Sequence, residues 1–336
     1  MAAYNYWVNS EFNAAPNGSL MRTHPLGVIC IDKSQGETFR IATEFSLVTH
    51  ADPRCVTACC ISTALIRGIL RGEIQSEEDI DAVIDVAFEW AYLWQRRGRR
   101  FEEDPQIGTD DEWVDAAVKI DDVDDDGRQL STDKPDMSEE QSTKPEPLLN
   151  RAELYRHVKA KDFQELQLDD SMKMGYVYKS LGAGILALRQ AIHGYQSWNT
   201  KNKESFCRNI FENLITEIVM EGGDADTNAS IAGALLGAWL GYTALPAHWR
   251  DGIEHHDWLL SKCEALSYTI GITSGLDDYM GSKDLDAMED GGRGFLDKEA
   301  LEAREMAFME MYLKKRAESN VVENRKKGWK GKLFSK

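Results

Sequence analysis

The most informative stretch of this 336-residue sequence reads Glu221-Gly-Gly-Asp-Ala-Asp-Thr-Asn-Ala-Ser-Ile-Ala-Gly-Ala-Leu-Leu-Gly-Ala-Trp-Leu-Gly241. Its glycine pair ends one helix, and a second helix begins within the acidic turn that follows. Asp224 and Asp226 lie two residues apart in that turn, and Thr227 stands at the start of the second helix. Three hard oxygen donors can thus converge on one small cation, although a simple helix N-cap explains the same residue types.

The helix after this turn is expected to be buried, because residues 227–247 carry no charged side chain. Gly233, Gly237 and Gly241 recur at every fourth position, which places them on one stripe and predicts the close approach of another helix. The run is close to membrane-spanning length, but its polar residues and its proline favour a protein core over a membrane. A buried helix that directs two carboxylates toward one point favours a ligand site over a cap.

Helical signals also dominate the rest of the chain. Asp52 precedes Pro53, which is the pattern of an N-cap followed by proline at the first helical position. Ser76 precedes three acidic residues, and the helix that it starts ends in arginines, as the helix dipole favours. Further helices are predicted around 151–162, 171–193, 203–221, 227–242, 252–270 and 298–318, with brief strand-like alternation at 26–31 and 39–42. The predicted fold class is all-α, a compact multi-helix domain.

The acidic residues are concentrated in one segment. Residues 101–150 hold 17 Asp and Glu against 4 Lys and Arg, which is −13 of the formal net charge of −18, together with four of the eight prolines. So polar a composition cannot offset the entropy lost on ordering. We expect a disordered acidic insertion at about 101–150 within a helical domain of residues 1–275, and a C-terminal helical extension with a basic tail over 276–336.

Charge and cysteine content limit the classes of partner. An acidic balance argues against nucleic acid as a partner, and the basic residues of 314–336 are expected to form a solvated helix end and tail. The six cysteines lie among apolar residues, with no C-x-x-C pair and no secretory signal ahead of them. The simplest expectation is an intracellular protein with reduced thiols, cytoplasmic or nuclear, that does not contact a membrane.

Three further segments contain candidate ligand contacts. Asn17-Gly-Ser-Leu-Met-Arg22 offers free backbone amides that either cradle a diphosphate or only form a turn. Ser46-Leu-Val-Thr-His50 ends in a histidine that either hydrogen-bonds a helix start or binds a ligand. Gly175-Tyr-Val-Tyr-Lys-Ser180 contains tyrosines that either pack in the core or face a ligand. None of the three is specific alone.

The order of these motifs resembles that of the ADP-ribosylglycohydrolase family, which includes the ADP-ribosyl-acceptor hydrolases and dinitrogenase reductase-activating glycohydrolase. The stretch around Asp224 is similar to the family's G-G-D-x-D-T-N metal motif and the A-x-I-A-G-A-L-L-G-A that follows it. The other segments resemble, in the family's order, its G-N-G-S/A-x-M-R, S-x-x-T-H and G-Y-V stretches. The resemblance spans about Asn17 to Leu260, apart from the acidic insertion.

The resemblance implies a helical hydrolase that cleaves the glycosidic bond of ADP-ribose conjugates, with a pair of Mg²⁺ or Mn²⁺ ions. The implied partner is an ADP-ribosylated protein or a small ADP-ribose conjugate. The implied metal ligands are Asp224, Asp226 and Thr227. The implied substrate contacts are Asn17, Gly18, Ser19, Arg22, His50, Gly175 and Tyr176.

Two departures from the family pattern matter. Pro16 replaces the first glycine of G-N-G-S, and its fixed φ alters the phosphate-side loop. Family members also begin with a segment that supplies a catalytic Glu and a T-D-D-T metal motif, and nothing before Asn17 supplies either. We therefore expect a domain that is incomplete at its N-terminus, with the catalytic residue unknown.

Three acidic patterns in the insertion are weak substitutes. Residues 109–112 read Thr-Asp-Asp-Glu, but without the apolar helical surroundings of the family motif. Residues 121–125 fit the D-D-x-x-D of isoprenoid synthases, in a segment that is polar on every side. Residues 122–133 approximate an EF-hand loop, but Pro135 interrupts the helix that should follow.

Three hypotheses follow. The chain is a metal-dependent hydrolase whose site other residues complete, a degenerate ADP-ribose-binding module without turnover, or a truncated, non-enzymatic interaction protein. The residues give no preference among arginine, serine and a small-molecule ester as the acceptor.

Overall fold

The computed structural model describes residues 2–99, 146–197 and 203–274, together with isolated helical positions between 299 and 314. The chain divides into two compact units, Met1–Ser274 and Gly275–Lys336. Most of the acidic insertion, including its three acidic patterns, and most of the C-terminal extension and basic tail lie outside the described residues. The end of the insertion is ordered, because Gln95 donates to the Pro147 carbonyl at 2.8 Å and accepts from the Leu149 amide at 3.0 Å.

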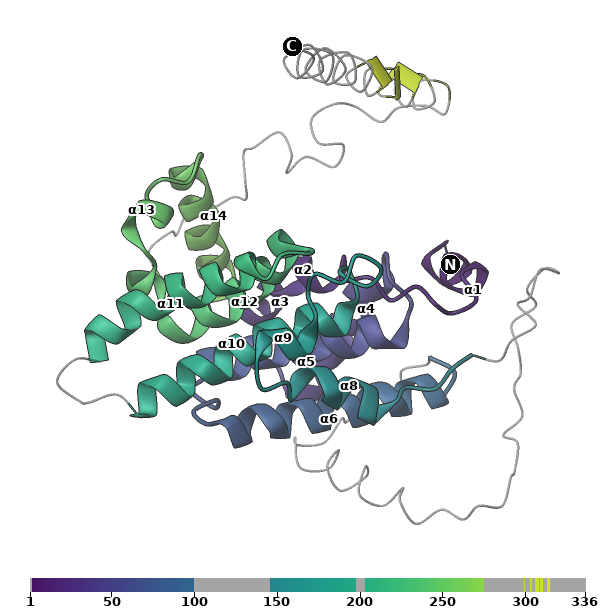
Figure 1. The fold of residues 1–336 in the computed structure, drawn as a ribbon, viewed down its shortest axis with the longest axis horizontal. Coiled ribbons are helices and arrows are strands. Elements are labelled where there is room, and N and C mark those ends of the chain that lie inside the picture. Colours follow the sequence, from purple (N-terminus) through teal and green to yellow (C-terminus); the bar gives the residue numbers. More distant parts are fainter. Residues whose placement is uncertain are drawn as a thin grey trace, which may run out of the picture. The chain divides into compact units, whose positions relative to one another are not determined.

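Helices form every regular element of the described residues, and no strand occurs among them, so the all-α prediction is confirmed (Figure 1). The only β-type pairing in this part of the chain is an isolated antiparallel bridge between Pro16 and Tyr176. The elements of the first unit are α1 (Ala2–Asn9), α2 (Leu20–Thr23), α3 (Pro25–Ile29), α4 (Gln35–Leu47), α5 (Pro53–Leu70), α6 (Glu77–Arg96), α8 (Arg151–Val158), α9 (Phe163–Leu166), α10 (Val177–Ser197), α11 (Lys203–Met220), α12 (Ala225–Leu240), η2 (Tyr242–Ala244), α13 (Ala247–Arg250) and α14 (His256–Thr269).

Local capping explains where the helices begin. The Asp52 side chain accepts the Arg54 amide at the start of α5, and Ser76 forms a capping box with Asp79 at the start of α6, as the sequence predicts. The strand-like alternation at 26–31 and 39–42 is a wrong prediction. Those residues lie largely in α3 and α4, and a capping box at Ser34 favours the helix over the short alternating pattern.

The helix predicted to begin at residue 171 begins later. α10 starts at Val177, and an irregular segment precedes it, in which Gln167 adopts the left-handed conformation with φ of 49°. The helix predicted over 151–162 ends at Val158, and α9 follows as a separate short helix. This irregular segment contributes Leu168, Asp169 and Gly175 to the surroundings of the acidic motif.

Two long helices, α5 and α10, lie in the middle of the first unit, with α6 and α8 on one side and α11 and α12 on the other (Figure 1). Among the described residues α5 is long and apolar enough to span a membrane by length and composition alone, and 83% of that stretch is buried inside the unit. Its buried face continues into α10 and α12 through Tyr178, Ile185, Ile231 and Leu235. The core therefore lies directly beneath the start of α12.

The glycine stripe of α12 does not make the predicted close helix contact. A Cβ on Gly237 would have no atom within 4 Å, and one on Gly233 would come no closer than 3.9 Å to its neighbours. The close approach uses Gly184 of α10 instead, where a Cβ would lie 2.8 Å from Ile231 Cγ2. The prediction was wrong because α12 buries the face that carries Ile231 and Leu235, which leaves the glycine stripe to one side.

Candidate functional site

The turn before α12 has a backbone that requires glycine. Gly222 and Gly223 have φ values of 79° and 66°, in the left-handed region that favours glycine. A Cβ on Gly223 would also lie 1.9 Å from the Leu168 carbonyl oxygen, which is closer than any real contact. The irregular segment after α9 therefore packs directly on the turn, and the turn holds Asp224 at the N-cap position of α12.

Asp224 occupies the N-cap position without acting as a cap. Its side chain makes no capping hydrogen bond to the first turn of α12. Asp226 is exposed, and its Oδ1 accepts the Thr227 amide at 2.9 Å. That amide, and next the Asp224 side chain, lower the pKa of Asp226, which favours its charged form. The observed geometry thus removes the main support for the alternative in which Asp224 is only a cap.

The donor chemistry at this turn fits one divalent cation. Two carboxylates and the Thr227 hydroxyl are oxygen ligands of the type that Mg²⁺ and Mn²⁺ prefer. Asn228, the next residue, is fully buried, and neither Nδ2 nor Oδ1 of its side-chain carboxamide has a hydrogen-bond partner among the described residues. Buried amides are almost always bonded to protein or water, so this one indicates a polar occupant close to the motif. In the described ranges no group of three or more His, Cys, Asp and Glu side chains that could hold a metal is found.

The Asn17 segment meets the acidic motif. The Asn17 amide donates to the Gly175 carbonyl at 3.0 Å, and the Val177 amide donates to the Ala15 carbonyl at the same distance. These two bonds flank the bridge between residues 16 and 176. The Asn17 side chain then donates from Nδ2 to Asp224 Oδ2 at 2.7 Å. Segments that lie 207 residues apart in the chain therefore share one hydrogen bond at the site.

Ser19 and Arg22 are engaged with the protein. The Ser19 hydroxyl is fully buried and accepts from Ser46 Oγ at 3.2 Å and from Cys59 Sγ at 3.4 Å. The Arg22 guanidinium donates to the Phe45 carbonyl at 2.8 Å and to Thr49 Oγ1 at 2.7 Å. Their side chains thus fasten the Asn17–Arg22 loop to α4 and α5.

His50 lies against Gly18. A Cβ on Gly18 would be 3.0 Å from both Cε1 and Nε2 of the imidazole, and Thr49 Oγ1 lies 2.7 Å from its Nδ1. Burial and, to a smaller extent, the Arg22 charge lower the pKa of His50. The imidazole is therefore neutral near pH 7, and it flanks the loop that carries Asn17.

Gly175 and Tyr176 complete the group. A Cβ on Gly175 would be 3.7 Å from Asp224 Oδ2, so the backbone just before α10 lies beside this carboxylate. The Tyr176 hydroxyl donates to Glu153 Oε1 at 2.7 Å, and the Arg54 guanidinium lies 5.8 Å from the ring centroid. Burial and the bond to Glu153 raise the pKa of Tyr176, so that the phenol stays neutral.

This geometry agrees with the sequence comparison. The family model for the ADP-ribosylglycohydrolases matches residues 2–273, which is most of the chain. The chain belongs to the ADP-ribosylglycohydrolase family. Both the helical fold and the convergence of the Asn17, His50, Gly175 and Asp224 segments are therefore seen in a member of this family.

Individual relatives of this family member match short stretches. An ADP-ribosylarginine hydrolase of Serratia proteamaculans is 28% identical over 111 residues, which is 33% of this chain and 26% of the relative. A protein of Acanthamoeba polyphaga mimivirus, provisionally named an ADP-ribosyl glycohydrolase, is 54% identical over 43 residues, 13% of each chain. An uncharacterised protein of Archaeoglobus fulgidus is 29% identical over 124 residues, 37% of each chain. The match thus spans well under half the length of each of these relatives, and no solved structure matches the chain.

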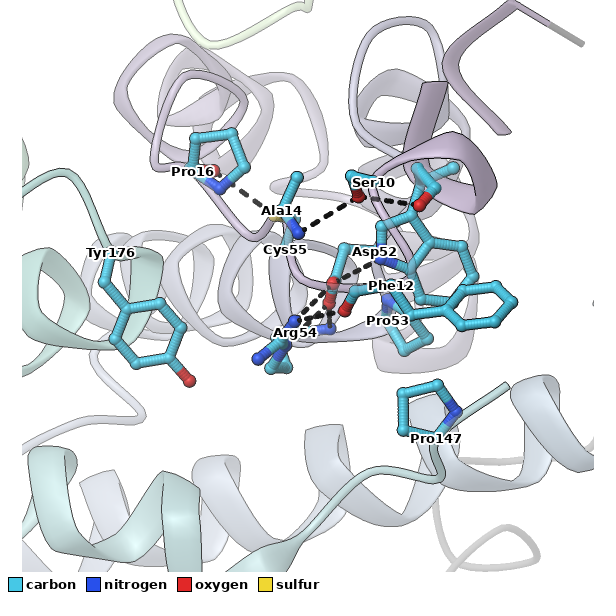
Figure 2. Close-up of polar contacts among 12 residues, drawn as sticks. Ser10, Phe12, Ala14, Pro16, Asp52, Pro53, Arg54, Cys55, Pro147 and Tyr176 are labelled. Carbon is cyan, nitrogen blue, oxygen red and sulfur yellow. Dashed lines mark hydrogen bonds and ion pairs between the residues drawn. The ribbon is translucent and has the colours of Figure 1, made fainter. Parts of the chain in front are cut away.

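One polar cluster of this glycohydrolase-family chain was missed from the sequence. The buried Asp52 accepts from Trp7 Nε1 at 2.6 Å and forms a bidentate pair with Arg54, at 3.0 Å to Nε and 2.7 Å to Nη2 (Figure 2). Figure 2 shows the Arg54 side chain between this carboxylate and Tyr176. Asp52 was expected only as a cap, and its Asp-Pro-Arg context was the signal that could have identified Arg54 as a neighbour of the site.

The cluster borders a small cavity of about 190 Å³. Trp7 and Phe12 line one part of it, and Asp52, Arg54 and Glu153 supply its polar lining. The bond to Glu153 orients the Tyr176 phenol, and Arg54, which is paired with Asp52, lies beside the same ring. Arg54 and Glu153 therefore support the site from the side of α5 and α8.

Proposed function

We propose that this chain acts on ADP-ribose conjugates as a glycohydrolase that uses Mg²⁺ or Mn²⁺. Asp224, Asp226 and Thr227 would hold the cation. Family membership supports the reaction class, and the hydrogen bond from Asn17 to Asp224 is the observation that carries the assignment. That bond joins the loop expected at the phosphates to the motif expected at the cation. A bound divalent ion supplies charge stabilisation and orientation of the ribose and water.

The chain's own residues have distinct parts in this proposal. The backbone amides of Gly18 and Ser19 would bind the phosphates, since the Asn17 amide already donates to the Gly175 carbonyl and the Ser19 side chain is engaged in the core. Tyr176, held by Glu153, would orient the adenosine side as a fixed and neutral ring. His50 would flank the same loop as a neutral imidazole. No described residue is assigned as the catalytic acid.

We also propose that the chain by itself hydrolyses slowly. The donors at α12 suit one ion, and an ion held by two carboxylates and a hydroxyl keeps several water ligands. A misplacement of about 1 Å costs on the order of 10²-fold in rate, and an absent acid costs roughly 10²–10⁴-fold more. A second cluster of carboxylates from elsewhere would be needed to complete the pair.

Release of ADP-ribose from modified peptides tests this proposal. Arginine is the first acceptor to try, because one relative is named an ADP-ribosylarginine hydrolase, and a serine peptide is the comparison. We expect slow turnover by the 336-residue chain, and loss of this turnover with Asp224→Ala. Robust turnover by the chain alone would show that residues already present complete the site.

A binding module without turnover is the second candidate. It is favoured by the contrast between the substrate side, where Gly18, His50, Gly175 and Tyr176 are brought together, and the cation side, where the described residues supply two carboxylates. Calorimetry with ADP-ribose, with and without Mg²⁺, separates the candidates. Binding without turnover supports the module, and no binding supports an interaction protein.

We also propose an intracellular location, in which reduced thiols such as the buried Cys55, Cys59 and Cys60 persist.

A further inference from the structure

The carboxamide of Asn17 has no proton left for a ligand. Nδ2 carries two hydrogens, and it donates to Asp224 Oδ2 at 2.7 Å and to Ser180 Oγ at 2.8 Å. Asn17 is 6% exposed, and Ser180 is fully buried. Both Nδ2 hydrogens are therefore used in bonds within the protein, so the side chain binds the acidic motif and cannot also donate to a phosphate.

The position of this carboxamide is fixed from several directions. The Asn17 amide is bonded to the Gly175 carbonyl, and the bridge between Pro16 and Tyr176 joins the same loop to the start of α10. Ser180 lies on the first turn of α10 and anchors Nδ2 from the buried side. The backbone and the amide are thus set before any ligand arrives, and Asp224 Oδ2 is oriented by a group outside its own helix.

We propose that Asn17 is a positioning residue that orients the Asp224 carboxylate for a divalent cation and couples the cation to the phosphate-side loop. This inference rests on the proposed function, in which Asp224 is a ligand of the cation. A carboxylate with one oxygen held by an amide offers its remaining lone pairs in a fixed direction. Removal of such a partner behind a metal ligand typically weakens metal binding by about 10–100-fold.

Titration with Mn²⁺ alone tests the positioning role. The free ion is followed by its paramagnetic resonance signal in wild type, Asn17→Ala, Ser180→Ala and the control Asn13→Ala. Asn13 is an exposed asparagine in the same segment. We expect a Kd for Mn²⁺ about 10–100-fold higher in Asn17→Ala, a smaller increase in Ser180→Ala, and no change in Asn13→Ala. Thermal unfolding of the ion-free proteins is measured alongside, because a merely structural role would lower Tm and leave Kd unchanged.

The outcomes separate this inference from the proposed function. If wild type binds no Mn²⁺ at millimolar concentration, the cation site is wrong, and the positioning role is overturned with it. If wild type binds and both Asn17→Ala and Ser180→Ala bind equally well, only the positioning role is overturned. Should Asn17→Ala fail to fold, Ser180→Ala decides, since it keeps the carboxamide and removes its buried anchor.

A linkage measurement tests the coupling itself. The affinity for ADP-ribose is measured with and without saturating Mn²⁺, in wild type and in Ser180→Ala. Because linkage is reciprocal, a cation that stabilises the loop must strengthen ADP-ribose binding by the same factor by which ADP-ribose strengthens cation binding. We expect this factor to exceed one in wild type and to fall toward one in Ser180→Ala. An equal factor in both proteins would overturn the coupling.

Discussion

The two ends of the α12 stretch contain glycines with opposite surroundings. Gly223 has a left-handed backbone, and a Cβ there would lie 1.9 Å from a carbonyl oxygen, whereas a Cβ on Gly237 would have no atom within 4 Å. Both glycines belong to the same continuous family motif and look alike in the sequence. The motif therefore combines a rigid turn, which positions Asp224, with a glycine stripe that makes no close helix contact among the described residues.

The largest effect is expected at the rigid turn. Gly223→Ala should destabilise the protein by about 3 kcal/mol, because strained backbone and contact with the Leu168 carbonyl add together. Urea unfolding measures the change. A midpoint equal to that of wild type would show that the turn is not rigid and that the segment after α9 shifts to accommodate the added methyl group.

The acidic residues of the turn are expected to act on the cation rather than on folding. Asp224→Ala and Asp226→Ala should each weaken Mn²⁺ binding by about 100-fold, which corresponds to about 2.7 kcal/mol. The ion-free proteins should keep their fold, because both side chains lie at the partly exposed start of α12 and the Asp224 side chain does not cap that helix. Calorimetric titration measures the affinity, and Asp257→Ala, at an exposed acid of α14, is the control. Unfolding of the ion-free variants would contradict this expectation.

A smaller loss of stability is expected at Gly184 of α10, where an added methyl group would meet side chains and not backbone. A Cβ on Gly184 would lie 2.8 Å from Ile231 Cγ2 and 3.2 Å from Leu235 Cδ1. Gly184→Ala should cost about 1–3 kcal/mol, since side chains in a packed core can shift slightly while a carbonyl in the turn cannot. Its urea midpoint should fall between those of wild type and Gly223→Ala. The reverse order would show that the contact between α10 and α12 is the stiffer of the two.

The sequence predicted the helices and the segments of the site better than their contacts. Asp52 and Ser76 mark helix starts through local hydrogen bonds, so they could be read from neighbouring residues. The stripe of Gly233 and Gly237 could not be judged in this way, because its use depends on which face of α12 meets α10. The hydrogen bond from Asn17 to Asp224 could not be predicted from the sequence either, since it depends on tertiary structure across 207 residues.

The stability of the fold should also respond to pH, through partly buried histidines. Burial lowers the pKa of His50, whose imidazole lies against Gly18, and it lowers the pKa of His24 and His157 as well. Between the folded and the unfolded pKa the unfolded chain binds more protons, so stability is present above about pH 6.5 and is lost as the pH falls below it. Tm measured from pH 7.5 to 5 should decline, and His50→Asn should flatten part of the decline. A rise in Tm on acidification would contradict this.

The smallest effect, a gain in stability, is expected for a substitution in the glycine stripe of α12. Gly237→Ala should stabilise the protein by about 0.5–1 kcal/mol, because a helical alanine loses less backbone entropy on folding and meets no neighbour here. Chemical denaturation measures the gain. A loss of stability would mean that another chain or segment covers the stripe in solution.

The contact between Asn17 and Asp224 also dictates when the site can form. It closes a loop of 207 residues, so the site cannot assemble on a ribosome until about two-thirds of the chain has been synthesised. Loop-closure entropy grows only with the logarithm of length, so residues 100–145 add only about 0.2 kcal/mol to the cost of closing it. An acidic segment of this size can therefore lie between the two halves of the site at little thermodynamic cost. Its main effect is kinetic, because the nascent chain must wait longer before Asn17 can meet Asp224.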